Sequence, residues 1–308
     1  LSEQFLKAGS VSNPKGAVAA VSTATGNTHT MFNNIIAMGI YDGLFPKKVG
    51  TAGAALSNGK LTLYSAYPNN PYNWVSAFSQ WNSLMGDPST HLWTDTPEIF
   101  QVNYNEDIPF GTNYLEIEVL TETGEPVDMA MVTLLKGNDE IFINGFTDEN
   151  GRAVIHLGYQ YGGQLSVTVT KQDCKPFIGT ATIITEGKLV NLDNIVTVEI
   201  NDEGGDGLWN PGETAEIAIP LYNYGFVGVS GVTAEITTTA EYMDIIEGSA
   251  YYGSMGVGQS QYGEAFTVSL SPSAMEREEL KLYLIISDDS GEEWHSILNM
   301  NCVGTHLI

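Results

Sequence analysis

The sequence predicts a multidomain protein in which an α/β segment is followed by two all-β domains. Near residue 97 the spacing of apolar residues changes from the 3.6-residue period of helices to the 2-residue period of strands. The chain has 308 residues, which is long enough for two or three domains with separate cores. We therefore place the domains at residues 1–96, 97–194 and 195–308.

Charge is distributed unevenly between these parts. Residues 1–96 carry five lysines and four acidic residues, whereas the rest of the chain carries seven basic and 33 acidic residues. Such an acidic surface disfavours nucleic acid and anionic membranes as partners. It suits a calcium-rich extracellular setting, although acidity that only keeps β domains soluble is an alternative explanation. Because no run of about 18 apolar residues occurs, no membrane-spanning helix is expected.

The α/β segment begins with a predicted short helix over residues 2–9. Residues 16–23 form a continuous apolar run, which is typical of a buried parallel strand. Apolar residues at helical spacing then predict helices over residues 31–43, 49–64 and 73–85. The segment is therefore expected to build helices against a sheet.

The last of these predicted helices has the clearest apolar stripe. Gly86 would provide its left-handed C-cap, and Pro88 would prevent its continuation. Its predicted inner face consists of Trp74, Phe78, Trp81 and Met85. These aromatic side chains are expected to form core rather than a sugar-binding platform.

Strict alternation of apolar and polar residues predicts the strands of both β domains. Residues 114–121 and 164–170 alternate in the first domain, with turn-forming segments rich in Gly, Asp and Asn between them. Alternating runs continue from residue 195 to residue 286, and residues 287–294 predict a hairpin. Each domain has the size and pattern of a small β-sandwich.

The stretch DEGGDGLWNPGE, residues 202–213, matches much of the calcium-loop template. A hard calcium ion needs several oxygen ligands from one tight loop, and the final glutamate can bind it through both oxygens. One position is filled by Gly204, and the flanking segments are strands, so this is not an EF-hand. The alternative is a solvated acidic turn. The candidate ligands of a structural calcium ion are Asp202, Asp206, Leu208, Asn210 and Glu213.

Histidine and cysteine residues offer few candidates for catalysis. His29 follows the predicted strand at residues 16–23, and loops at the carboxyl ends of parallel strands often form α/β sites. A single loop histidine is also commonly a bystander. Cys174 and Cys302 lie in no CxxC or metal-spaced pattern. No serine-hydrolase, phosphate-loop or zinc-peptidase motif occurs.

Several stretches of each segment are similar to known families. The first segment contains SEQFLKAG, PKGAVAAVSTATGNTH, GKLTLYSAY and WNSLMGDPSTHLW. By these stretches it resembles the C-terminal half of the gingipain-like cysteine peptidase domain, peptidase family C25. The second segment, through GEPVDMAMVTLL and FTDENGRA, resembles a carboxypeptidase regulatory-like or Ig-like module. The third, through GDGLWNPGETAEIAIPLYNYG, resembles the Ig-like domains that follow such secreted peptidases.

This resemblance implies a caspase-like fold for residues 1–96 and peptide-bond hydrolysis by a Cys/His dyad. The dyad would lie upstream of Leu1, so neither Cys174 nor Cys302 is carried over as the nucleophile. The implied partners are the missing N-terminal half of the peptidase domain and protein or peptide substrates. The implied location is the outside or the surface of a bacterial cell. The chain opens inside a predicted helix, so we expect it to be a processed or truncated piece of a larger protein.

One loop of the family carries over residue by residue. By resemblance, the segment after the apolar run borders the pocket for the substrate residue that precedes the scissile bond. In this sequence it consists of Thr25, Gly26, Asn27, Thr28 and His29. The Arg- or Lys-specific members place an aromatic residue there, so this sequence departs from their pattern.

Three hypotheses about function remain open at this point. In the first, the chain is the C-terminal portion of a secreted cysteine endopeptidase with accessory β domains, and it lacks the catalytic residues itself. In the second, it belongs to a non-catalytic adhesion protein whose peptidase-like segment is a relic and whose β-sandwiches bind partners or glycans. A structural subunit that polymerises through strand edges is a third possibility, which the acidic surface opposes at low calcium.

Overall fold

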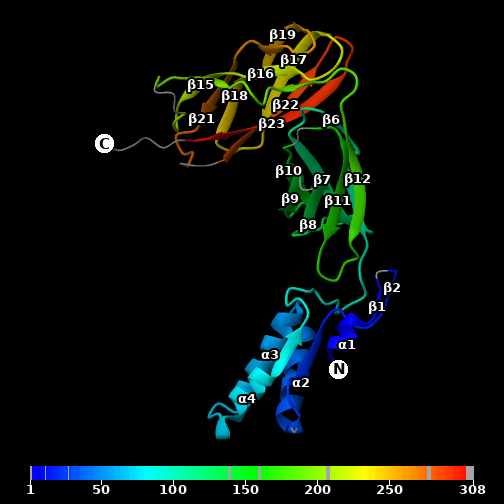
Figure 1. Cartoon of the computed structure of the whole chain (residues 1–308). Coiled ribbons are helices and arrows are strands. Elements are labelled where there is room, and N and C mark those ends of the chain that lie inside the picture. Colours follow the sequence, from blue (N-terminus) through cyan, green and yellow to red (C-terminus); the bar gives the residue numbers. More distant parts are fainter. Residues whose placement is uncertain are drawn as a thin grey trace. The chain divides into compact units, whose positions relative to one another are not determined.

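The protein is multidomain and mostly β, and it divides into two compact units (Figure 1). Unit 1 comprises residues 1–100 and 170–176, and unit 2 comprises residues 101–169 and 177–308. The computed structural model describes residues 2–10, 12–26, 28–137, 140–158, 161–205, 209–275 and 279–302. No helix of these described residues is long and apolar enough to cross a membrane. The predicted division of the β region at residue 195 stays a prediction.

Unit 1 contains helices and short strands. In chain order they are α1 (Ser2–Lys7), β1 (Gly9–Ser10), β2 (Asn13–Pro14), β3 (Ala20–Thr23), α2 (Thr30–Leu44), α3 (Ala52–Ala66), the 3-10 turn η1 (Pro71–Asn73), α4 (Trp74–Trp81) and β4 (Asn82–Met85). The predicted helices at residues 2–9, 31–43 and 49–64 are all present, within a few residues at their ends.

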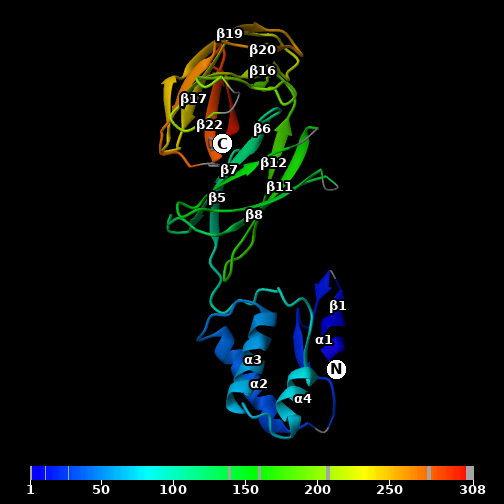
Figure 2. The same cartoon turned by 90° about the vertical axis from the view of Figure 1, so that its left-hand side faces the viewer.

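Helices α2 and α3 run side by side in both views (Figures 1 and 2), and glycines allow their close contact. A Cβ atom on Gly39 would lie 2.8 Å from the Cα atom of Gly59, and a Cβ atom on Gly59 would lie 2.6 Å from the carbonyl oxygen of Ile36. The Nδ2 atom of Asn58 donates to the carbonyl oxygen of Gly39 at 2.5 Å. An Asn-Gly pair, usually a turn signal, therefore serves here inside a helix as the contact point with its neighbour.

The prediction of a helix over residues 73–85 is wrong in its last turn. Helix α4 ends at Trp81, and Asn82 has an extended backbone with ψ 104°. The Asn82 amide donates to the carbonyl oxygen of Phe78 at 3.0 Å and to Oδ1 of Asn33 at 3.0 Å. The backbone N–H of Asn82 also donates to the carbonyl oxygen of Phe78, as the last bond of the helix. From Asn82 onward the chain is extended and pairs with β3, with Asn82 opposite Thr23.

Helical spacing also misplaced part of the predicted inner face. Phe78 is fully buried, but Trp74 is 40% exposed and Met85 is 36% exposed. Gly86 does have a left-handed backbone, with φ +126°, but it follows strand β4 rather than a helix. The buried core of the helices consists of Phe32, Ile36, Leu56, Leu63, Val75 and Phe78.

The prediction of a buried parallel strand at residues 16–23 is also wrong. Strand β3 covers only Ala20–Thr23 and pairs antiparallel with β4, Ala20 lying opposite Met85. Val18 is 72% exposed and Val21 is 40% exposed. Within the described residues this sheet has two strands, so it offers no interior in which an apolar strand can be covered on both faces.

The end of the α/β segment, near residue 94, is anchored by the loop at residues 170–176, which belongs to unit 1. The Asp173 carboxylate accepts from the backbone N–H of Thr94 at 2.6 Å and from its hydroxyl at 3.1 Å. Gln172 donates to the carbonyl oxygen of Leu92 at 2.6 Å. Hydrogen bonding from Thr94 outweighs desolvation and lowers the pKa of Asp173, which therefore stays ionised and keeps accepting both bonds.

Unit 2 begins with two sheets. They have the strand orders β10-β7-β5 and β6-β12-β11-β8-β9. The strands are β5 (Phe100–Tyr104), β6 (Asp107–Pro109), β7 (Tyr114–Thr121), β8 (Met131–Lys136), β9 (Ile141–Phe146), β10 (Arg152–His156), β11 (Gly163–Thr170) and β12 (Phe177–Ile184). The strands predicted at 114–121 and 164–170 are confirmed, and their apolar residues are buried at alternate positions.

The remainder of unit 2 contains three sheets. Their strand orders are β13-β16-β20, β14-β15-β21-β18 and β19-β17-β22-β23. The strands are β13 (Val190–Leu192), β14 (Glu199–Asp202), β15 (Thr214–Ala218), β16 (Pro220–Asn223), β17 (Val229–Thr238), β18 (Met243–Glu247), β19 (Ser249–Met255), β20 (Ser260–Tyr262), β21 (Phe266–Leu270), β22 (Glu279–Ser287) and β23 (Glu293–Asn301). The hairpin predicted at 287–294 joins β22 to β23, with Gly291 at φ +82°.

Buried polar contacts hold β23 against the segments at residues 112–113 and 188–191. Asn113 pairs with the backbone of Ile297 in both directions, donating from Nδ2 at 2.6 Å and accepting at Oδ1 at 2.8 Å. Asn191, which has no exposed surface, donates to Thr112 and accepts from the hydroxyl of Ser296. Because each of these amides satisfies backbone or side-chain groups on another segment, the arrangement inside unit 2 is closely specified.

Candidate functional site

The loop after β3 is an exposed segment that leads into α2. Of its predicted residues, Thr25 and Gly26 are exposed, Thr28 is half-buried and His29 is exposed, while Asn27 lies outside the described residues. Nothing lies within 4 Å of the position that a Cβ atom on Gly26 would occupy. The loop therefore presents an open rim rather than a packed surface.

His29 serves as the N-cap of α2. Its backbone is extended, and its Nδ1 atom accepts from the backbone N–H of Met31 at 3.2 Å. The ring also packs edge-on against Phe32, with 5.7 Å between ring centroids. His29 thus has a structural role at the start of the helix, which the sequence did not predict.

The rest of this loop is tied to the end of α4. The Thr28 hydroxyl accepts from Asn33 at 3.0 Å, and Oδ1 of Asn33 in turn accepts from Asn82. The backbone N–H of Ala24 donates to the carbonyl oxygen of Trp81 at 2.8 Å. These bonds fix both ends of the loop.

The candidate calcium loop lies between β14 and β15, which pair with Asp202 opposite Ala215. Asp202 and Asn210 are both buried, at 6% and 5% exposure. The Glu213 carboxylate accepts from the backbone N–H of Asn210 at 2.9 Å and from its side-chain amide at 3.2 Å. Asp206 and Leu208 lie outside the described residues, so only three predicted ligands can be placed.

Gly204 lies where two of these carboxylates converge. A Cβ atom there would be 2.5 Å from Oε1 of Glu213 and 3.2 Å from Oδ2 of Asp202. In the calcium-loop prediction this glycine stood for a missing ligand. In the structure its lack of a side chain makes room for two carboxylates. Trp209 anchors the loop, since its side chain is buried in the core and its Nε1 donates to the carbonyl oxygen of Glu213 at 3.3 Å.

The donor set suits a hard cation, because carboxylate and amide oxygens are the ligands that calcium prefers. Among the described residues, no three His, Cys, Asp or Glu side chains gather closely enough to hold an ion. Asp202 and Glu213 thus supply two carboxylates that point at one position, and the calcium site stays a prediction.

The two cysteines show no sign of an activated nucleophile. Cys174 and Cys302 are both buried. Burial and the nearby charge of Glu98 raise the pKa of the Cys174 thiol, so that this thiol stays protonated at neutral pH. Its Sγ atom donates to the carbonyl oxygen of Gln172 at 3.4 Å.

The structure contains a cavity in unit 2 that the sequence did not predict. It is lined by polar and aromatic side chains of β5, β7, β10 and β23, including Glu116, Glu118 and Arg152. Alternation marked these positions only as the outward face of a strand. The signal available was Glu116 and Glu118 on one predicted strand and Arg152 some 35 residues later, but the pairing of β7 with β10 could not be predicted from the sequence.

Comparison with known proteins supports the resemblance of the first segment. Residues 2–93 match the model of peptidase family C25. No curated protein sequence matches the chain.

Among solved structures, the chain is similar to the Arg-specific cysteine proteinase gingipain R, with 19% identity and a TM-score of 0.47, covering 59% of this chain and 41% of that chain. It is similar to the same extent to the complex of the RgpB pro- and mature domains from Porphyromonas gingivalis, with 19% identity, a TM-score of 0.47, and coverage of 59% and 42%. The chain thus spans about two fifths of the length of these relatives.

Proposed function

We propose that this chain is the C-terminal portion of a secreted gingipain-like cysteine endopeptidase whose catalytic Cys and His lie outside it. The observation that carries the proposal is the match of residues 2–93 to peptidase family C25. In such an enzyme a thiolate attacks the peptide carbonyl, and the histidine lowers the thiol pKa and later protonates the leaving amine. The chain contributes scaffold and accessory β domains to this reaction.

Unit 1 is then the C-terminal half of a caspase-like α/β domain. The incomplete sheet supports this assignment. Strand β3 pairs only with β4 among the described residues; Val18, just before β3, is 72% exposed, and Val21, within it, is 40% exposed. Two strands alone are marginal in water, and further strands from the other half of the domain would cover these side chains. The partner is that N-terminal half, joined covalently or retained after processing.

The β region is assigned as two Ig-like sandwiches. The pairings of β7 with β10, β8 with β9 and β11 with β12 are antiparallel, and that of β6 with β12 is parallel. The apolar residues of β7, β8 and β11 point to one face of each strand. This pattern is typical of two sheets packed over a shared core. A calcium ion held by Asp202, Asp206, Leu208, Asn210 and Glu213 would tie the first long loop of the second sandwich to its core.

The loop at residues 25–29 is assigned as the border of the pocket for the residue before the scissile bond. Its exposure and its open rim at Gly26 support a role in contacting another chain. Since His29 is engaged as a helix cap, Thr25 and Thr28 would offer small hydroxyl groups rather than an aromatic surface. These side chains therefore do not favour Arg or Lys strongly as the substrate residue before the scissile bond.

The test compares the protein isolated from its source with recombinant chain 1–308. The isolated protein should exceed 33.3 kDa in intact mass and hydrolyse casein, and iodoacetamide should abolish this activity. The recombinant chain alone should be inactive and should regain activity only with the segment that supplies the Cys and His. An isolated protein of larger mass that neither cleaves casein nor reacts at an activated thiol would contradict the proposal and would favour a non-catalytic adhesion protein.

A further inference from the structure

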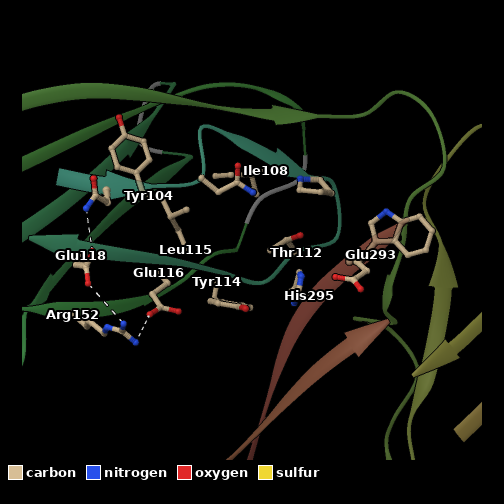
Figure 3. A pocket seen from close by; sticks show the side chains of 14 residues that line it. Tyr104, Ile108, Thr112, Tyr114, Leu115, Glu116, Glu118, Arg152, Glu293 and His295 are labelled. Atoms are coloured by element: carbon tan, nitrogen blue, oxygen red, sulfur yellow. Dashed lines mark hydrogen bonds and ion pairs between the residues drawn. The ribbon is translucent and has the colours of Figure 1, made fainter. Parts of the chain in front are cut away.

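The cavity in unit 2 has the construction of a small-molecule site. Its volume is about 580 Å³, within the range of roughly 300–1,000 Å³ that is usual for ligand pockets. One wall comes from β5, β7 and β10, and the other comes from the start of β23 (Figure 3). It is lined by Asn103, Tyr104, Asn105, Ile108, Pro109, Thr112, Tyr114, Leu115, Glu116, Glu118, Arg152, Glu293, Trp294 and His295.

Hydrogen-bond donors and acceptors alternate on the first wall. Arg152 lies opposite Glu118 in the register of β10 and β7, and its guanidinium is shared between Glu116, at 3.5 Å, and Glu118, at 3.8 Å (Figure 3). Asn103 donates to Glu118 at 3.1 Å. Both ion-pair distances exceed the roughly 2.7–2.9 Å of a tight charge-assisted bond, so the N–H groups and carboxylate oxygens can still bond to a third partner.

Tyr114 adds an aromatic surface beside this network. It lies two residues before Glu116 on β7 and is labelled between Glu116 and His295 in Figure 3. Burial, followed by the nearby charge of Glu116, raises the pKa of its hydroxyl. The hydroxyl therefore stays protonated and can both donate and accept.

The two walls are held in place before any ligand arrives. The Asn113 amide, immediately before Tyr114, pairs in both directions with the backbone of Ile297, two residues after His295. The Nδ2 atom of Asn299, further along β23, lies 3.3 Å from the Nε2 atom of His156 on β10. A cavity fixed on both sides in this way requires little ordering when a ligand binds.

We propose that this cavity binds a neutral saccharide. Sugar hydroxyls donate and accept at the same time, and they match a wall on which Arg152 and Asn103 supply donors while Glu116 and Glu118 supply acceptors. The apolar face of a sugar ring can pack against the ring of Tyr114. Neither property follows from the proposed peptidase function, so the two proposals stand independently.

Charge narrows the choice of ligand. Three carboxylates and one guanidinium line the cavity, and the whole chain carries a formal charge of −25. Phosphorylated, sulfated and carboxylated ligands would therefore be repelled. A cationic ligand would be attracted by the glutamates but would have to approach the guanidinium of Arg152, which two of them already share. An uncharged polyhydroxyl ligand meets neither obstacle.

The test is an NMR titration in which the chemical shifts of the full chain are monitored as maltotriose, cellotriose, chitotriose or mannotriose is added. Each is taken to about 10 mM, enough to detect a millimolar Kd. We expect saturable shifts of signals from β7 and β23 with at least one probe. Arg152→Ala should weaken that binding at least about tenfold, because it removes a charged donor, and Tyr114→Phe should weaken it less. Glu125→Gln, in an exposed turn outside the cavity, is the control and should bind as the unmodified chain does.

Three results would overturn the proposal. The first is the absence of saturable shifts with all four trisaccharides. The second is equal affinity of the Arg152→Ala variant, provided that its melting temperature is unchanged. The third is binding of trilysine, added as a cationic comparator, when no saccharide binds, since the cavity would then recognise positive charge.

Discussion

Units 1 and 2 differ most in how much apolar side chain they bury. The helical core of unit 1 consists of Phe32, Ile36, Leu56, Leu63, Val75 and Phe78. The cluster in the C-terminal part of unit 2 extends from Leu189 to Cys302 and includes apolar residues from most of its strands. Because stability depends on buried apolar area, unit 2 can stand alone, whereas unit 1 has little reserve.

Unit 1 also exposes apolar side chains. The outer faces of α2 and α3 carry large apolar side chains that are more than half exposed, namely Met38, Tyr41, Leu61 and Tyr64. A domain that completes its own fold usually covers more of such surface. This exposed surface and the small core fit the proposal that unit 1 is part of a larger domain. The difference in core size between the units can be tested through the stability of each unit.

The largest expected effect comes from Phe78→Ala. The Phe78 ring is fully buried and lies 4.9 Å from Phe32 and 5.2 Å from Trp81 between centroids. Its loss should cost about 3–5 kcal/mol, enough to unfold unit 1 while unit 2 stays folded. Hydrogen exchange of the full chain should show fast exchange throughout α2 and α3 and unchanged protection in β22.

The matched control is Phe266→Ala, which removes an equally buried ring from unit 2. It should leave β22 protected because the surrounding core is much larger. If α2 and α3 remain as protected in Phe78→Ala as in the unmodified chain, unit 1 is stable on its own and the contrast between the units is wrong.

Calcium should produce the next largest effect, and only in unit 2. An ion present at about 100 times its Kd stabilises the folded state by about 2.7 kcal/mol. For a unit of this size, removal by a chelator should lower the melting temperature by roughly 5–10 °C. The measurement is calorimetry of the full chain with calcium and with EGTA.

The variants Asp202→Asn and Glu213→Gln sharpen this test, because their carboxylates converge over Gly204. Both should melt at the temperature of the chelated protein and should not respond to EGTA. Glu216→Gln, on the neighbouring strand β15, keeps the response. A melting temperature that is the same with calcium and with EGTA in the unmodified chain would leave the loop as a solvated turn.

The sequence predicted the two units with different success, for physical reasons. In unit 2, the alternation of apolar and polar residues directly reports which side chains are buried. Leu115, Ile117 and Val119 are buried because they point to one face of β7. In unit 1, helical spacing continued through residues 82–85 by coincidence. The helix ends at Trp81 because the chain from Asn82 onward is extended and pairs with β3, and no periodicity reports such a pairing.

For the candidate sites, too, local sequence patterns predicted less than long-range contacts determine. Residue types suggested Asp202 and Glu213 as ligands of one calcium ion, which stays a prediction, and in the structure both carboxylates lie near Gly204 because β14 and β15 pair. The capping role of His29 depends on a backbone angle and on a single bond to Met31. The cavity around Arg152 depends on which strands pair, which is long-range information absent from local patterns.

The smallest expected effect is a pH-dependent one at Asp288, a side chain with no exposed surface. Burial by itself would raise the pKa of this carboxyl. Hydrogen bonds from Lys188 at 2.6 Å and from Ser290 outweigh burial and hold the pKa well below its usual value of 3.8. Such a group stabilises the folded state above about pH 4, and the contribution is lost as the pH falls toward the folded-state pKa.

Asp288→Asn should therefore lower the melting temperature of unit 2 at pH 7 by roughly 3–6 °C, from about 1.5 kcal/mol. We take the low end of the range for charged bonds because the Lys188 side chain is 27% exposed and can be hydrated again. Below about pH 4 the difference from the unmodified chain should shrink, because the unfolded carboxyl is then protonated. Asp289→Asn, at the exposed neighbouring position, should show little difference at any pH. A deficit in Asp288→Asn that stays constant from pH 7 to pH 3 would mean that packing, rather than the charge of Asp288, holds the hairpin, and unit 2 would then owe its stability to its apolar core alone.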